Sequence, residues 1–178
     1  MNIFALLLSL IFSASLCGNS LLHRRVSLTS CDQGVHVKYE HEKPDDIYYQ
    51  MGAVVYPAPK AIGIYSKVGY TFKMSPDKFV SPYAVIHSAH STSRGVSGGL
   101  GIKSIQHINS FISIGAEVHG RLAMHVLNLG IVEIHTPIIF HLGNDRNVDF
   151  EVIPSHVYYF GAAKGKASSV AGSIGYRF

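Results

Sequence analysis

The chain has 178 residues, of which 47% are hydrophobic and 15% charged, and its formal net charge is +4. This length suggests one domain, and the charged fraction is too low for a long disordered polyampholyte. The two cysteines are too few for a disulfide scaffold or a four-ligand zinc module. No run of Lys and Arg could grip a phosphate backbone, so nucleic acid is not expected as a partner.

The chain opens with an uncharged apolar stretch over residues 1–15, followed by small residues and Cys17. An apolar core of about 10 to 12 residues is too short for a membrane-spanning helix and is typical of a secretory signal. We therefore predict that residues 1–17 are a signal peptide that exports the chain, cleaved after Ser15 or after Cys17. Acylation of Cys17 is the alternative, although Leu16 is a poor residue before a lipidated cysteine.

From Val35 onward, side chains of one class recur at every second residue, which is the period of β-strands. Residues 18–34 are instead predicted to form an irregular leader. Turn residues separate the alternating runs, and no stretch has a helical period. Pro137 and Pro154 indicate an edge, a bend or a strand end. The predicted strands are 35–42, 48–56, 62–73, 79–90, 96–106, 111–120, 122–135, 137–142, 148–163 and 168–178.

The alternation fits either a soluble β-protein or a membrane barrel, and three features favour the barrel. The polar faces are rich in small residues, which suit the crowded interior of a narrow barrel. Many runs reach the ~9–11 residues that a tilted strand needs to cross a bilayer. Tyr and Phe lie near the ends of the runs, where interfacial girdles form. We predict an all-β, closed, antiparallel up-and-down transmembrane β-barrel over residues 35–178.

The final nine residues, Val170-Ala171-Gly172-Ser173-Ile174-Gly175-Tyr176-Arg177-Phe178, resemble the terminal strand of bacterial outer-membrane β-barrels. Those proteins end on Phe, with apolar or aromatic residues at alternate positions before it. The resemblance implies that the barrel-assembly machinery reads this strand, with the assembly signal in Val170, Ile174, Tyr176 and Phe178. Gly-rich runs at 62–72 and 98–103 are similar in style to small OmpA/OmpX-like and opacity-type barrels.

The resemblance also implies a location in the outer membrane of a Gram-negative bacterium. Outer-membrane lipid and lipopolysaccharide are then the expected partners, and the oligomeric state stays open. Single-chain bacterial barrels have even strand numbers. We predict eight strands, with one or two weak runs forming loop or leader, and keep ten as the alternative. Side chains fill the interior of an eight-stranded barrel, so a general diffusion porin is not expected.

Acidic residues and histidines share strand faces at two places in the second half of the chain. Glu117 and His119 are two residues apart, as are Glu133 and His135. If both pairs face the interior from neighbouring strands, the four side chains meet, together with Arg121 or Lys103. A proton relay, a metal site or a hydrolytic cluster could result, but the favoured interpretation is a buried network of paired charges. No coordination geometry is fixed, so neither a metal nor a cofactor is predicted.

Three functions follow, and the sequence favours a non-enzymatic outer-membrane barrel with a structural, adhesive or surface-interaction role. The second is a lipid A or phospholipid hydrolase of the barrel wall. Some outer-membrane deacylases carry a His-x-Ser-Asn motif, but here His90 is followed by Ser91 and Thr92. The third function is a secreted soluble β-barrel that binds a small apolar ligand. The hydrolase would use a set from Ser88, His90, Glu117, His119, Glu133 and His135.

Overall fold

The computed structural model describes residues 23–31, 34–57, 61–90, 94–123, 129–142, 147–161 and 164–178. The predicted signal peptide and Cys17 lie outside these residues. No helix in the described part of the chain is long and apolar enough to cross a membrane. The strands are β1 (Arg24–Cys31), β2 (Gly34–His41), β3 (Asp46–Tyr56), β4 (Ala61–Ser75), β5 (Lys78–His90), β6 (Arg94–His107), β7 (Ile112–Ala123), β8 (Leu129–His135), β9 (Ile138–Leu142), β10 (Val148–Gly161) and β11 (Gly165–Arg177).

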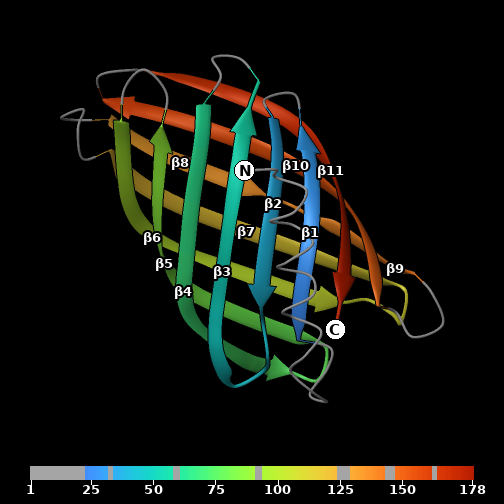
Figure 1. The fold of residues 1–178 in the computed structure, drawn as a ribbon. Helices are drawn as coiled ribbons and strands as arrows, with labels where there is room; N and C mark the ends of the chain where they lie inside the picture. Colours follow the sequence, from blue (N-terminus) through green and yellow to red (C-terminus); the bar gives the residue numbers. More distant parts are fainter. Residues whose placement is uncertain are drawn as a thin grey trace.

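These strands form one antiparallel sheet that closes on itself as a barrel, with β11 paired to both β10 and β1 (Figure 1). The short strands β8 and β9 share one position in the wall, because both pair with β7 on one side and β10 on the other. They are separated only by Thr136 and Pro137. Since Pro137 has no N–H to donate, it interrupts the ladder there. The wall is thus a closed ten-stranded barrel in which one strand position is split.

Ten strand positions replace the eight that we preferred, and the ten-stranded alternative is correct. The leader predicted over 18–34 was wrong for residues 24–31, which form β1 and pair along their length with β2 and β11. Only Val26 and Leu28 give β1 an apolar face, so its alternation is weak without its neighbours. The predicted run 122–135 combines the end of β7 with β8.

The barrel is apolar outside and polar inside. Alternate side chains on each wall strand face outward, and large hydrophobic residues there are widely exposed, for example Leu100 at 73%. The inward positions carry mainly small, polar and charged side chains, beside some apolar ones such as Val85 and Ile105. Thr71, Ser81, Ser113 and Asp149 have no exposed surface. Other exposed apolar residues include Leu28, Val35, Ile47, Met51, Ile62, Ile64, Val68, Ile86, Ile102, Leu122, Val170 and Ile174.

Exposed aromatic rings gather mainly at one end of the barrel. We call it the terminus end, because β1 begins there and β11 ends there (Figure 1). Tyr158 and Phe160 lie toward the opposite end, near the end of β10. Aromatic rings near strand ends are the arrangement of an interfacial girdle. At the terminus end the exposed rings are Tyr70, Phe72, Phe111, Phe150 and Tyr176.

Candidate functional site

The barrel encloses a cavity of about 360 Å³ lined by charged side chains of both signs. Buried charges are tolerated only when opposite charges pair with them. Every acid of this lining has such a partner: Glu40 and Glu42 pair with a lysine, as does Glu117, while Glu133 and Glu151 each pair with an arginine. The cations of the lining are Arg25, Lys38, Lys67, Lys103, Arg121 and Arg177.

Two lysines link strands that are not neighbours in the wall, so their ion pairs cross the interior. Lys103 on β6 donates to Glu40 at 2.6 Å and to Glu42 at 2.7 Å, both from the β2 side of the barrel. Lys67 on β4 reaches Glu117 on β7 at 2.5 Å. Each of these bridges therefore occupies part of the barrel interior.

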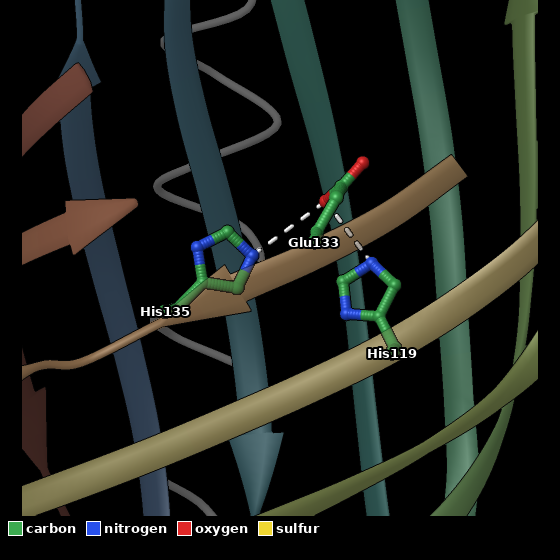
Figure 2. Close-up of side chains that lie close together, drawn as sticks. All are labelled: His119, Glu133 and His135. Atoms are coloured by element: carbon green, nitrogen blue, oxygen red, sulfur yellow. Dashed lines mark ion pairs between the residues drawn. The ribbon is translucent and has the colours of Figure 1, made fainter. Parts of the chain in front are cut away.

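In the barrel interior, His119 of β7 converges with Glu133 and His135 of β8 (Figure 2). His119 lies directly across from Glu133, and Glu117 across from His135, in the pairing of β7 with β8. Directly opposed residues of an antiparallel pair have Cβ atoms about 4.5–5.5 Å apart. As a result, His119 Nε2 lies 3.0 Å and His135 Nε2 3.5 Å from the same Glu133 oxygen, Oε2.

Hydrogen bonds on the sides that face away from Glu133 fix the orientation of the rings. Tyr83 Oη donates to Glu117 and lies 3.3 Å from His119 Nδ1. The Tyr83 ring reaches this position across Gly101, where a Cβ atom would come within 2.5 Å of the ring and 2.6 Å of the His119 Cβ. A glycine is therefore needed at this crossing point for the tyrosine to support the cluster.

The remaining sides of the cluster are also occupied. On the other side, His135 Nδ1 lies 2.8 Å from Ser155 Oγ. Arg121 donates to the second Glu133 oxygen, Oε1. Both rings and the carboxylate are therefore held in orientation by the residues around them.

Four of the six residues considered for hydrolysis are thus brought together: Glu117, His119, Glu133 and His135. Ser88 is not among them, because it alternates with His87, which lines the cavity, and shares the outward face of Ile86. The His90 side chain lies outside the described part of the structure. The acids and histidines therefore meet as expected, together with Arg121. Ser88, the serine of the proposed hydrolytic set, faces outward instead.

A second cluster, which the sequence analysis missed, lies near the terminus end. Ser113 Oγ is 2.7 Å from His141 Nε2, and His141 Nδ1 is 2.7 Å from Asp149 Oδ1. The other Asp149 oxygen accepts from Arg177 Nε at 2.6 Å, and Arg25 Nε lies 3.1 Å away. Ser113, His141 and Asp149 come from β7, β9 and β10, so only the strand register brings them together.

Comparison with known proteins identifies the fold. The KdgM porin superposes with a TM-score of 0.52 at 9% identity, over 87% of this chain and 98% of the porin. A second KdgM porin structure, solved with disordered oligogalacturonate, gives the same TM-score at 8% identity, with the same coverage. LpxR from Salmonella typhimurium gives 0.50 at 10% identity, over 86% of this chain and 73% of LpxR.

The fold is that of an outer-membrane β-barrel. These similarities support the general resemblance to bacterial outer-membrane barrels but not the narrower OmpA/OmpX-like or opacity-type assignment. The strand number also speaks against the narrower assignment, since small OmpA/OmpX-type barrels have eight strands and this wall has ten positions. No family model matches the sequence, and no curated protein matches it either.

Proposed function

We propose that this chain is an integral outer-membrane protein with a closed, ion-paired interior and a structural, adhesive or surface-interaction role. One observation carries the proposal: the wall is apolar outside, while inside it buried ion pairs join strands that are not neighbours. An apolar exterior is stable against lipid tails and costly in water. A soluble barrel for an apolar ligand would need the reverse distribution of side chains.

The closed interior argues against free diffusion of solutes. The pairs Lys103–Glu40 and Lys67–Glu117 each span the interior. The cavity that remains inside the barrel has a volume of about 360 Å³. KdgM is named a porin, but at 9% identity its transport role does not carry over to this chain. A barrel with a filled interior fits a role at the membrane surface better than a role in transport of solutes across the membrane.

The proposal includes two partners, the barrel-assembly machinery and the outer-membrane lipids with lipopolysaccharide. The last strand supports the first partner, since Val170, Ile174 and Tyr176 project outward at 60%, 56% and 50% exposure. Phe178 ends this apolar row, and its N–H donates to the Arg24 carbonyl at 3.0 Å, where β11 meets β1. The apolar exterior supports contact with lipid.

Heat-modifiability tests the membrane barrel. We expect the unboiled protein to run faster than the boiled protein on a denaturing gel, and to fractionate with the outer membrane. In planar lipid bilayers the purified protein should show no sustained porin-like conductance, because the ion pairs block the interior. An unshifted band from the soluble fraction would overturn the membrane proposal, and large stable current steps would overturn the closed interior.

Ester hydrolysis is the second candidate, favoured by the hydrogen-bonded series Ser113–His141–Asp149. This order of a serine, both ring nitrogens of a histidine and an aspartate is the arrangement that activates serine nucleophiles. The Ser113 side chain has no exposed surface, and His107 Nδ1 also lies 2.6 Å from its hydroxyl. Hydrolysis therefore requires the adjacent turn at 108–111 to move before an ester can reach the serine.

Substitution of Ser113 separates this candidate from the first one. If the barrel hydrolyses a phospholipid ester in mixed detergent micelles, S113A should lower the rate at least a hundredfold. S27A is a matched control, since Ser27 is a buried inward serine whose hydroxyl has no hydrogen-bond partner among the described residues. An inactive parent protein, or equal rates for S113A and S27A, would remove hydrolysis as a function.

A further inference from the structure

We propose that His119, Glu133 and His135 form a binding site for one divalent first-row transition-metal ion, of which Zn²⁺ is the best match. The two histidines and the carboxylate come from the facing strands β7 and β8, and all three line the interior cavity. The proposal rests on the fold and on these contacts, and it does not depend on the role proposed for the barrel.

The spacing of the three side chains fits a small metal ion. Their nearest ligand atoms all lie within 4.8 Å of one another, and the two histidine nitrogens are 3.0 and 3.5 Å from Glu133 Oε2. Tetrahedral zinc with bonds of about 2.0–2.1 Å places its ligand atoms about 3.3 Å apart. Two edges of the required triangle are therefore already formed, and a small rotation of the rings completes the third.

The hydrogen bonds behind the rings present lone pairs to the same point. Tyr83 gives its hydroxyl hydrogen to Glu117, so its oxygen accepts from His119 Nδ1–H. Ser155 Oγ lies 2.8 Å from His135 Nδ1 and 3.4 Å from the Ile153 carbonyl, and when the serine donates to this carbonyl its oxygen accepts from His135 Nδ1–H. In these tautomers both Nε2 atoms carry a lone pair that faces the Glu133 carboxylate (Figure 2).

With both rings protonated at Nδ1, three acceptor atoms converge, and a cation between them stabilises the arrangement. Metal-binding histidines ordinarily donate their other ring N–H to an oxygen, which fixes the ring and the tautomer, as Tyr83 and Ser155 do here. Arg121 binds Glu133 Oε1 and so leaves Oε2 for the ion. Protonation of both imidazoles is the alternative to metal binding, and it would convert the cluster into ordinary ion pairs between histidines and Glu133.

The ligand types select the class of metal. Imidazole nitrogens suit Zn²⁺, Cu²⁺ and Ni²⁺, whereas Mg²⁺ and Ca²⁺ prefer sites made of oxygen alone. Three protein ligands leave one position of a tetrahedral ion open. Since all three residues line the cavity, this position can face the barrel interior and take up water.

The test uses the full barrel, folded in detergent and stripped with chelator, titrated with Zn²⁺ by calorimetry and with Co²⁺ by absorption. We expect one ion per chain, no response to Mg²⁺, and the visible bands of tetrahedral Co²⁺. E133Q and H135Q should each weaken Zn²⁺ binding at least tenfold. H156A is the control, since His156 is an exposed histidine on the outward face of β10 and should bind like the parent.

The outcomes are distinguished by first checking that each variant keeps the faster unboiled band. Folded variants that lose Zn²⁺ binding, beside an H156A protein that keeps it, support the site. Absence of Zn²⁺ binding by the folded parent overturns it, as does equal binding by the parent and by folded E133Q and H135Q. If neither glutamine variant folds, the parent Co²⁺ spectrum decides, because octahedral bands or no bands would exclude the three-ligand tetrahedral site.

Discussion

Replacing Lys103 with Met should be among the most damaging single changes in the barrel. The Lys103 ammonium is the shared cation of Glu40 and Glu42, and its side chain is only 10% exposed. Breaking a buried ion pair by removing one partner costs about 3–5 kcal/mol, because the other charge stays buried without compensation. We expect the free energy of unfolding to fall by about 3 kcal/mol, since the cavity admits some water. Urea unfolding of the purified barrel in detergent or lipid vesicles measures the loss.

A second variant separates the loss of charge from the loss of packing. K103M combined with E40Q and E42Q should recover most of the lost stability, because no buried charge is then left unpaired. K73M is the matched control, since Lys73 lies exposed near the end of β4. A K103M protein as stable as K73M, or a triple variant no better than K103M, would contradict the ion-pair explanation.

Replacing Asp149 with Asn should weaken the barrel where its first and last strands meet. The Asp149 carboxylate is fully buried and holds Arg25 of β1, Arg177 of β11 and His141 of β9. Asparagine keeps the shape but removes the negative charge that all three partners share. The free energy of unfolding should fall by about 3 kcal/mol, by the same rule for broken buried pairs.

The location of that damage provides the measurement. Amide hydrogen exchange should rise first in β9 and in the facing ends of β1 and β11, while the middle of β3 to β6 stays protected. D46N is the control, since Asp46 is a half-exposed acid that pairs with Lys43 at 3.6 Å, and its exchange pattern should match the parent. Uniform acceleration over all strands in D149N would argue against a local role for Asp149.

The strands could be predicted from the sequence where their apolar faces are long. β4, with Ile62, Ile64 and Val68 facing outward, is an example. β1 could not be predicted, because its inward side chains are polar and its outward row is short. Its structure depends on hydrogen bonds to β2 and β11, which no local pattern encodes. The preference for eight strands was wrong because it assigned weak runs to loop or leader, whereas the weakest of them, 35–42 and 137–142, contribute β2 and β9 to the wall.

The alternation of inward and outward residues along the strands was enough to predict one of the two interior clusters but not the other. Glu117 and His119 face the interior because they alternate with outward Val118, and the following strand brings Glu133 and His135 opposite them. That meeting needs only neighbouring strands. Ser113, His141 and Asp149 also need the exact register of β9, a strand of only five residues. Register depends on the closure of the whole barrel, so this second cluster was beyond sequence reasoning.

The break at Pro137 has a mechanical consequence for the wall. β9 is separated from β8 by two residues, and its backbone pairs with β10 on one side and with β7 on the other. Gly115, opposite Pro137, leaves room for the proline ring, and its N–H donates to the Pro137 carbonyl at 2.8 Å. The hydrogen bonds from His141 to Ser113 and Asp149 also link β9 to its neighbours β7 and β10. Backbone and side-chain hydrogen bonds on both sides therefore keep the wall continuous across the split strand position.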